Sequence, residues 1–483
     1  MRHSSALRRS GLALILFSCL LAHGWGEDLR MYLVSQTATP GSAAMVKIAG
    51  TMAYVCDTTE GLRIYDISNP GQPVFKGAYR LDGASASDVA FYGSFVYLTA
   101  RDSGSTPHGG TYVLDISNPS TPQRLNFLPT TGPAGDGSCA VSGNRLLITT
   151  YGGNKIGYFT QLLLMDLTDP ANPRKVDQWL MGGFPNRMQV SGNYAAVAHT
   201  NSGVKIFDIS SPSRVWLKSR YVESYATDAA FLGKDLVFSM FGNYSDLDTA
   251  SPGIQILELN QSTVTPRGAY YTRSDVNSLC TRNRLIFLAA SDLGIIALAA
   301  PTLDQIIEKG TYDTPGSASG VTADDKYLYV ADGAAGFEIL RYSDAPVTTD
   351  DDAIIISHTI PGAMTAGQTI TATVTVANQS KNAWTLAKKY RLALTKPSPL
   401  WTLPCPRIDL PSGVTVPPNG ETTFSLTLKA PNTAGTYPIE LRMARDSSHS
   451  FGEKLVVPVS VTRAAMSLTG SAGMTQNDWK AYK

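Results

Sequence analysis

The sequence predicts an all-β protein in which a seven-bladed β-propeller is followed by an immunoglobulin-like β-sandwich. Three observations support this fold class. Charged residues make up only 16% of the 483 residues, while Gly (42) and Pro (28) are plentiful and no long stretch shows helical periodicity. A strand-bearing unit recurs along the first two thirds of the chain, and a different pattern of alternating strands follows it.

The recurring unit is clearest in its first four copies. Each copy has a Gly, an apolar strand, and a second strand that ends in Asp before an Asn-Pro, Asp-Pro or Ser-Pro turn, as in Gly61-Leu-Arg-Ile-Tyr-Asp66-Ile-Ser-Asn-Pro70. The position of that aspartate recurs at intervals of 41 to 51 residues, at Asp66, Asp115, Asp166, Asp208, Glu258, Ala299 and Arg341. A period of this length that carries only strands predicts propeller blades of four strands each.

The ends of the repeated region predict how the ring closes. The seventh copy stops at Arg341-Tyr342 without a fourth strand, and Leu29–Ser35 has the pattern of that missing strand. We therefore expect a ring over residues 29–342 in which the N-terminal segment completes the last blade and hides two sheet edges.

The repeated pattern, with its Gly-Leu-Arg-Ile-Tyr-Asp-Ile-Ser-Asn-Pro-Gly-Gln-Pro run, resembles the LVIVD repeat of bacterial and archaeal surface or secreted propellers. The match is strong in the first four units and weak in the last three. The resemblance implies a propeller fold and an extracellular setting, and it implies no particular activity.

A second domain follows a polar linker at residues 343–352, and we predict a sandwich over 353–463 and a disordered tail over 464–483. Its alternating strands are expected at 354–357, 369–377, 390–395, 422–429, 437–444 and 454–462. Trp384, Val376-Ala-Asn378, Pro418-Asn-Gly420 and Gly435-Thr-Tyr437 resemble the four-tryptophan immunoglobulin-like family, which is also found on bacterial surface proteins.

The N-terminus predicts export. Residues 1–26 combine a basic start with an apolar stretch that is too short to span a membrane, as in a signal peptide. Leu16-Phe-Ser-Cys19 also resembles a lipoprotein box, so Cys19 is a candidate lipid anchor. We expect a secreted, periplasmic or cell-surface protein. Cys56, Cys139 and Cys280 fall in different blades and Cys405 in the other domain, which predicts free thiols.

Charge and motifs argue against several functions. A net charge of +1 gives no basis for binding nucleic acid. The chain has no P-loop, Rossmann fingerprint, nucleophile elbow or zinc-ligand spacing, so we expect neither a cofactor nor a metal site. Asp246 and Asp248 are weak Ca²⁺ candidates. The repeated aspartates are expected to satisfy backbone donors beside their turns.

Candidate binding residues come from loops that break the period. The loops between the second and third strands are expanded at 101–109, 151–160 and 241–252, and they share one face with the blade-to-blade connectors. Loops on a rigid scaffold are common binding sites. The predicted ligand-binding residues on that face are Arg101, His108, Tyr151, Arg187, His199, Tyr225, Asp228, Phe241, Asp292 and Asp332.

Three functions remain open at this point. The favoured hypothesis is an exported, non-catalytic binding or scaffold protein that holds a glycan or protein on the loop-bearing face. The first alternative is a polysaccharide hydrolase or lyase with its site in the same funnel, which would need His108, His199 and several carboxylates close together. The second alternative is a structural component of the cell surface.

Overall fold

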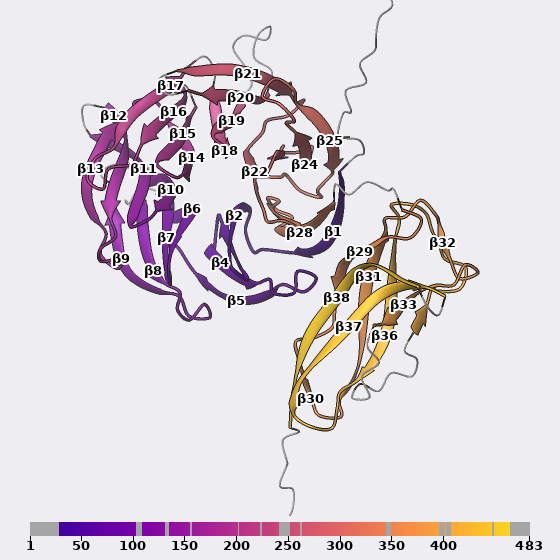
Figure 1. Ribbon diagram of the computed structural model, residues 1–483. Helices are drawn as coiled ribbons and strands as arrows, with labels where there is room; N and C mark the ends of the chain where they lie inside the picture. Colours follow the sequence, from indigo (N-terminus) through magenta and orange to yellow (C-terminus); the bar gives the residue numbers. More distant parts are fainter. Residues whose placement is uncertain are drawn as a thin grey trace, which may run out of the picture.

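The computed structural model describes most of the chain. The described residues are 29–102, 109–130, 135–154, 157–200, 202–222, 225–240, 252–260, 263–343, 349–395, 401, 407–446 and 449–463. They form strands and loops without an α-helix, and seven four-stranded antiparallel sheets are arranged around a common axis (Figure 1). The predicted fold class is therefore confirmed.

The first six blades each use four strands in consecutive order, from the axis outward. They are β2(Ala43–Ala49) β3(Met52–Asp57) β4(Gly61–Asp66) β5(Val74–Tyr79); β6(Ala84–Tyr92) β7(Phe95–Asp102) β8(Gly110–Asp115) β9(Gln123–Pro129); β10(Gly135–Ser142) β11(Arg145–Asn154) β12(Gly157–Asp166) β13(Arg174–Leu180); β14(Pro185–Ser191) β15(Tyr194–His199) β16(Gly203–Asp208) β17(Trp216–Tyr221); β18(Ala226–Leu232) β19(Asp235–Met240) β20(Gly253–Leu259) β21(Val264–Tyr271); and β22(Ser278–Arg282) β23(Leu285–Ala289) β24(Ile295–Ala299) β25(Ile307–Tyr312).

The seventh blade is closed by the N-terminal segment. Its order is β1(Arg30–Thr37), β28(Phe337–Ser343), β27(Tyr327–Ala331) and β26(Gly320–Ala323), so β1 is the outermost strand. β1 and β28 pair antiparallel from Arg30 with Ser343 to Thr37 with Phe337. The predicted closure is confirmed, and the edge of β28 is covered because the first described strand of the chain lies on it.

Local sequence explains the repeating hairpins. The turn between the two inner strands of a blade needs a positive φ, which Gly supplies in the first five blades and Asn283 supplies in the sixth. Further out, Asp66, Asp115, Asp166 and Asp208 each accept a hydrogen bond from the backbone N–H two residues later. The predicted structural role of these aspartates is confirmed.

One predicted loop is in fact a longer hairpin. β11 and β12 continue to pair from Tyr151 with Thr160 out to Asn154 with Gly157, where a loop was expected over 151–160. The inserted residues are added in register on both strands, so the hydrogen-bonded ladder extends beyond the other blades. The expanded segments at 103–108 and 241–251 lie outside the described residues.

The second domain is a β-sandwich. One sheet has the order β29(Ala353–His358), β31(Thr369–Asn378), β36(Glu421–Lys429). The other has the order β30(Ala363–Thr365), β38(His449–Thr462), β37(Gly435–Arg445), β33(Tyr390–Leu394), β34(Arg407–Asp409), and a small pair joins β32(Trp384–Thr385) to β35(Thr415–Val416). Trp384 is fully buried and packs against Tyr390 and Phe451, as expected for a core tryptophan.

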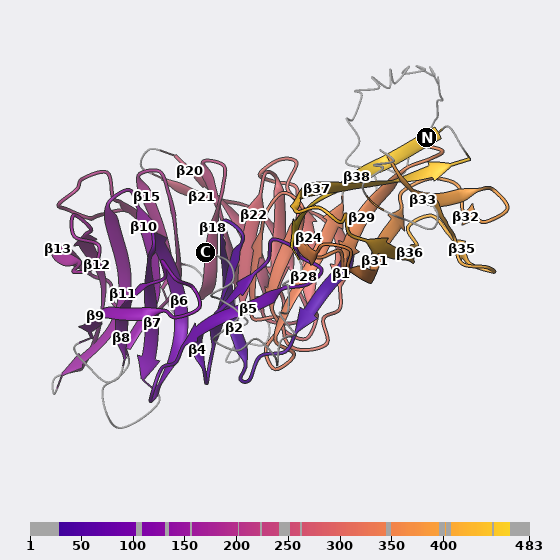
Figure 2. The ribbon, with the colours of Figure 1, turned by 90° about the horizontal axis from the view of Figure 1, so that it is seen from below.

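The sandwich packs against the seam of the ring, beside β1, β5 and β28 (Figures 1 and 2). Ile356 and Ala377 of the sandwich share a buried cluster with Tyr32, Tyr65 and Phe337 of the propeller. Gln379 donates a hydrogen bond to the Tyr32 hydroxyl at 2.9 Å. The contact therefore covers the strand that closes the ring.

A carboxylate also joins the two domains at this seam. Glu453 of the sandwich accepts hydrogen bonds from Lys326 at 2.8 Å, from Arg341 at 3.4 Å and from the Ile355 backbone at 3.1 Å. These donors hold the pKa of Glu453 below its ordinary value although burial raises it.

The described cysteines Cys56, Cys139 and Cys280 are buried free thiols, as predicted, and Cys405 lies outside the described residues, as do Cys19, the predicted signal peptide and the predicted tail. Among the residues that the structure describes, there is no apolar helix of membrane-spanning length.

We expect the seam to contribute strongly to stability. Tyr32→Ala removes a buried ring and leaves Gln379 without its acceptor, which should lower the free energy of unfolding of the propeller by roughly 3–5 kcal/mol. Leu33→Ala is the control, because Leu33 lies on the same strand but is 42% exposed and should change stability by about 0.5 kcal/mol or less. Equal effects of the two variants in chemical denaturation would contradict the packing at the seam.

We expect the stability of the protein to depend on pH because of Glu338. Neither carboxylate oxygen of this buried residue has a hydrogen-bonding partner, and burial together with Asp332 raises its pKa from 4.5 to about 7. The folded protein therefore holds this proton more tightly than the unfolded chain, and the group lowers stability progressively as pH rises from about 4.5 to about 7. Glu338→Gln should raise the melting temperature at pH 8 and leave it nearly unchanged at pH 4. A gain that is the same at both pH values would contradict this assignment.

Candidate functional site

The seven innermost strands, β2, β6, β10, β14, β18, β22 and β26, surround the axis and contact one another around it. Each starts at the face that carries the blade-to-blade connectors and the loops between the second and third strands, which we call the loop-bearing face. Equivalent positions on these strands therefore form rings around the axis.

Two successive rings are central to the candidate site. The upper ring holds the residue six positions before each hairpin turn, and its members are Ala44, Ser87, Gly137, Asn186, Thr227, Asn277 and Ser319. The lower ring holds the next residue in each blade, and its members are Met45, Asp88, Ser138, Arg187, Asp228, Ser278 and Gly320. Five of the seven residues of the upper ring are Ala, Gly, Ser or Thr, the other two are Asn, and five of the seven carry a hydroxyl or amide group.

All members of the upper ring line one pocket on the axis, which we call the axial pocket. It has a volume of about 410 Å³ and is also lined by Ser85, Ala86, Asp88, Arg101, Ser138 and Arg187. The volume lies in the range of small-ligand sites, which is about 300–1,000 Å³. Below it, a cavity of about 60 Å³ is lined by Met45, Asp88, Arg187, Asp228, Ser278 and neighbouring residues.

The two aspartates of the lower ring hold neighbouring blades together in the same way. Asp88 accepts hydrogen bonds from the Ser138 hydroxyl at 2.5 Å and the Cys139 backbone at 3.3 Å, both in the next blade. Asp228 accepts them from the Ser278 hydroxyl at 2.9 Å and the Leu279 backbone at 3.0 Å. Both carboxylates are buried, so these bonds replace the water that they lose on folding.

Each buried aspartate also has a cationic partner. Lys47 Nζ lies 2.6 Å from Asp88, and Arg187 Nε lies 4.0 Å from Asp228. Burial raises the pKa of Asp228, and Arg187 with the hydrogen-bond donors opposes that rise. The negative charges of the lower ring are thus largely compensated within the protein.

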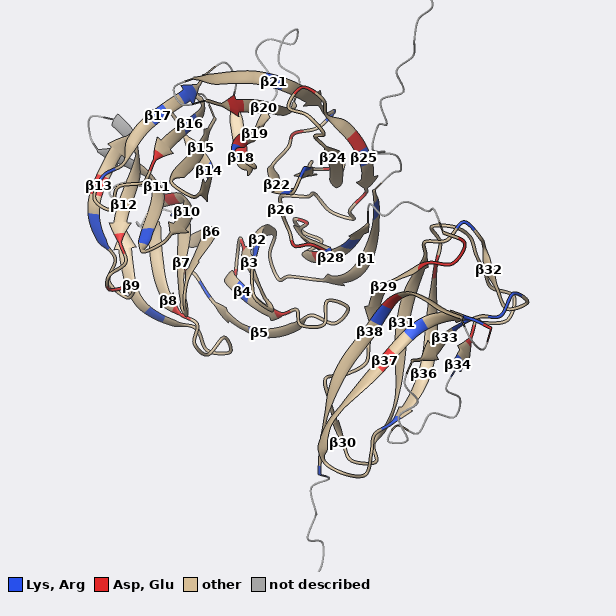
Figure 3. Cartoon of the chain, in the orientation of Figure 1, with Lys and Arg blue, Asp and Glu red and all other residues tan. Residues whose placement is uncertain are grey.

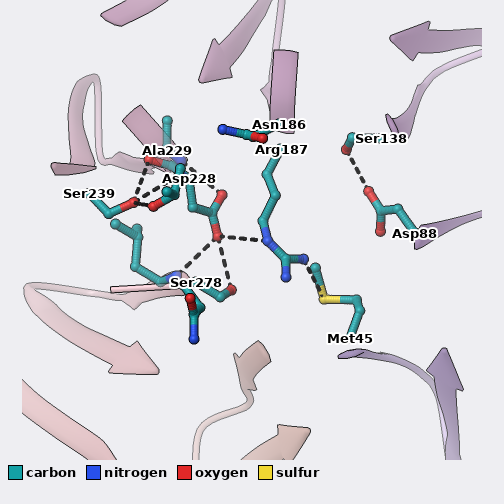
Figure 4. A network of polar contacts seen from close by, with 12 residues as sticks. Met45, Asp88, Ser138, Asn186, Arg187, Asp228, Ala229, Ser239 and Ser278 are labelled. Atoms are coloured by element: carbon teal, nitrogen blue, oxygen red, sulfur yellow. Dashed lines mark hydrogen bonds and ion pairs between the residues drawn. The ribbon is translucent and has the colours of Figure 1, made fainter. Parts of the chain in front are cut away.

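Arg187 crosses the axis between the axial pocket and the cavity below it (Figure 4). From the fourth blade it donates hydrogen bonds to the carbonyl oxygens of Ala44 at 3.4 Å and Ser319 at 3.1 Å, in the first and seventh blades. Its Nη1 donates to the Met45 sulfur at 3.2 Å. The guanidinium group therefore lies between the axial pocket and the cavity below it, and Arg187 lines both.

An aromatic stack lies against Arg101, which lines the axial pocket. The Arg101 guanidinium carbon is 5.1 Å from the centre of the Tyr151 ring, and the Phe184 ring stacks on Tyr151 with 6.2 Å between ring centres. Tyr151 donates a hydrogen bond from its hydroxyl to the Pro185 carbonyl oxygen. Burial raises the pKa of Tyr151, which therefore stays protonated at neutral pH.

Tyr151 thus links its blade to the next one, and three other side chains form equivalent hydrogen bonds between successive blades. Asn186 donates to the Ala226 carbonyl oxygen at 2.9 Å, Thr227 to that of Val276 at 2.6 Å, and Asn277 to that of Ala318 at 3.0 Å. Each bond joins one blade to the equivalent carbonyl of the next. The wall of the axial pocket is therefore held rigid by hydrogen bonds to the adjacent blades.

The structure brings together some of the predicted ligand-binding residues. Arg101 and Arg187 line the axial pocket, Tyr151 supports its mouth, and Asp228 lies in the lower ring. The use of these residues in binding stays a prediction. His108, Phe241 and the Ca²⁺ candidates Asp246 and Asp248 lie outside the described residues.

Four other predicted residues lie away from the axial pocket. His199 is fully buried, and burial with the nearby Lys205 lowers its pKa to about 3. Asp332 is buried and accepts hydrogen bonds from Thr314 and the Gly316 backbone, both at 2.7 Å. Asp292 accepts a hydrogen bond from Ser274 at 2.5 Å, and Tyr225 is half-buried just before β18.

The upper ring and Phe184 were missed in the sequence analysis, which searched the long loops instead. The signal was present in the repeat register, since a small or polar residue recurs six positions before the hairpin turn. Phe184 lies in the short connector Gly182-Gly-Phe-Pro185, where an exposed aromatic residue on the loop-bearing face could have been noticed. Among the described residues no group of three or more His, Cys, Asp and Glu side chains could hold a metal ion.

Known family models match both the repeats of the propeller and the second domain. The family model described as the LVIVD repeat matches residues 40–80, 83–125, 182–223 and 315–344, which correspond to the first, second, fourth and seventh blades. The model described as the Ig-like domain from next to BRCA1 gene matches residues 361–461. The chain is therefore a propeller protein with LVIVD repeats, followed by an Ig-like domain of this type.

The match to individual blades corrects one detail of the sequence analysis. The third copy was expected to be a strong match and the seventh a weak one, but the model matches the seventh and not the third. The third blade carries the extended β11–β12 hairpin, which lengthens the unit between its two conserved segments.

Several solved β-propeller structures are similar to this chain at low sequence identity. The computationally designed Ika8 protein has a TM-score of 0.44 at 12% identity, covering 65% of this chain and 100% of its own. The WD40 β-propeller domain of Doa1 has a TM-score of 0.49 at 10% identity, covering 65% and 97%. The β-propeller domain of Myceliophteria thermophila Cps50 (Swd1) has a TM-score of 0.48 at 9% identity, covering 65% and 100%. No curated protein matches the sequence.

The lower ring generates a stability prediction. Asp88→Ala removes the acceptor for Ser138 and Cys139 and leaves Lys47 without its ionic partner, which should lower the free energy of unfolding by about 3 kcal/mol. Asp66→Ala is the control, because it removes one hydrogen bond at an outer turn and should cost about 1 kcal/mol. Denaturation midpoints that fall equally in the two variants would show that the lower ring has no special role in holding blades together.

Proposed function

We propose that this protein is an exported, non-catalytic binding protein that holds a glycan in the axial pocket on the loop-bearing face of its propeller. The main observation is the composition of the pocket. Hydroxyl and amide side chains from successive blades line it together with Arg101, which stacks on Tyr151 and, through it, adjoins Phe184. Sugars combine many hydroxyl groups with apolar ring faces, and they are bound by this combination of groups.

The rigidity of the pocket supports binding. Because Asn186, Thr227 and Asn277 are each hydrogen-bonded to the next blade, they lose little conformational freedom when a ligand arrives. Their use as donors to the adjacent blade leaves the amide oxygens of Asn186 and Asn277 to accept hydrogen bonds from ligand hydroxyls. Propellers with LVIVD repeats are typically extracellular, which is consistent with an extracellular glycan and with the basic, apolar N-terminus.

A protein partner is the second candidate, and it has its own support. Leu180, Val222 and Tyr271 are more than half exposed at the ends of the outermost strands β13, β17 and β21 that meet the loop-bearing face. Exposed apolar side chains on one face are typical of protein contacts. Basic and acidic residues are interspersed around the ring (Figure 3), so the distribution of charge favours neither a glycan nor a protein partner.

The hydrolase or lyase alternative loses one of its required groups. It needed His199 to act with His108 in the funnel, and His199 is fully buried with a strongly lowered pKa. Asp88 and Asp228 are engaged in bonds between blades. A structural role at the cell surface would be detected as ordered self-association of the purified protein.

A glycan array with the purified protein tests the proposal. Phe184→Ala removes an aromatic ring that is 48% exposed and stacks on Tyr151 beside Arg101, and it should weaken binding of the detected glycan by roughly tenfold. Trp216→Ala is the matched control, because Trp216 is 44% exposed but lies at the end of β17 that is far from the loop-bearing face. The absence of any bound glycan, or an equal loss in both variants, would contradict the proposal. Capture of a protein that is lost on Leu180→Ser and Val222→Ser would favour the second candidate.

A further inference from the structure

One position of the lower ring differs from the others in charge. Its members are small, apolar or acidic in six blades, and Arg187 in the fourth blade is the only cation. Because the fourth blade lies opposite the first and seventh, its side chain crosses the axis to reach Ala44 and Ser319. The charge of this residue is therefore presented at the centre of the axial pocket floor.

The acidic residues of the lower ring have little capacity left for a ligand. Asp88 is bonded to Ser138, Cys139, Lys47 and the Val89 backbone. Asp228 is bonded to Ser278, Leu279 and the Ala229 backbone. A cationic or strongly donating ligand group would have to compete with these bonds, so the floor does not favour it.

Arg187, in contrast, has a donor that is poorly used. Its Nη2 is held by two carbonyl oxygens, but its Nη1 donates to the thioether sulfur of Met45, which is a weak acceptor. A carboxylate oxygen is a far better acceptor for the same N–H group. The guanidinium is fixed in place by the carbonyls, so it is already oriented for an anion that replaces the sulfur.

A second cation lies above it. Arg101 lines the axial pocket and stacks on Tyr151 at the mouth. The pocket lining contains two arginines and one aspartate, Asp88, whose charge is compensated by Lys47. Arg187 lies beside Asp228, so the positive charge in excess is that of Arg101, which would attract an anionic ligand to the pocket.

We infer that the axial pocket selects a sugar residue that carries a carboxylate, such as a uronic acid at the end of a glycan chain, with Arg187 as its anchor. The inference rests on the proposed function and narrows the ligand class. The ligand carboxylate takes the Nη1 donor of Arg187, its hydroxyls meet the upper ring, and its ring face contacts the aromatic stack at Phe184. Arg101 attracts the acidic chain to the mouth.

The test compares matched acidic and neutral sugars by titration calorimetry. The probes are galacturonate and glucuronate trisaccharides and the galactose and glucose trisaccharides of the same linkage. The protein should bind an acidic probe at least tenfold more tightly than its neutral counterpart, and the preference should shrink as salt is raised. Arg187→Gln should abolish the preference. Arg101→Gln should reduce the affinity for the acidic probe severalfold.

Two further variants keep the test decisive. Arg187→Lys retains a charge near Asp228, and it should still lose most of the preference because it lacks the planar fork. Arg282→Gln is the control, because Arg282 pairs with Asp325 at a hairpin turn on the face opposite the pocket. This variant should bind both probes as the unaltered protein does.

The outcomes separate the two proposals. Equal binding of acidic and neutral probes, or a preference that survives Arg187→Gln, overturns the assignment of Arg187 and leaves the glycan-binding proposal standing. Binding of neither kind of probe, together with an empty glycan array, overturns both proposals.

Discussion

The antiparallel pairing of β1 with β28 joins the two ends of the ring, and the axial pocket is complete only when the ring is closed. Each blade buries both faces of its sheet against its neighbours, so an open ring would expose the faces of the first and seventh blades. The sandwich adds to this contact, because Ile356, Ala377 and Glu453 cover the seam from outside. The second domain thus stabilises the strand that makes the axial pocket a closed site.

Within the ring, polar contacts between blades fix the spacing of the inner strands. Asp88 and Asp228 each bind a serine and a backbone N–H in the next blade, three blades apart, and Tyr151, Asn186, Thr227 and Asn277 bind successive carbonyls at the upper ring. Buried polar groups of this kind are favourable only when every member is satisfied. The same contacts that hold the ring leave a small set of oriented groups facing the axis.

The repeat made the architecture predictable from sequence. Period, turn residues and the incomplete seventh copy led to the number of blades and to the closing strand, because each follows from local patterns. The site was harder to predict from sequence, because its residues come from the start of seven strands and meet only after the ring closes. Arg187 was selected from sequence as a connector residue, but its path across the axis depends on the blades opposite. His199 was selected as a loop residue, and the structure buries it because the loop that follows is short.

The separation along the chain between β1 and β28 has a consequence for folding. The first strand is synthesised long before its partner, so the nascent chain carries an unmatched β-strand until almost the whole propeller exists. Blades can form their own hairpins early, but the final annealing of the ring is a late, non-local event. The interval before it is when the chain is most exposed to intermolecular strand exchange, and a molecule that borrows β1 from a neighbour would form a domain-swapped chain of propellers instead of a monomer.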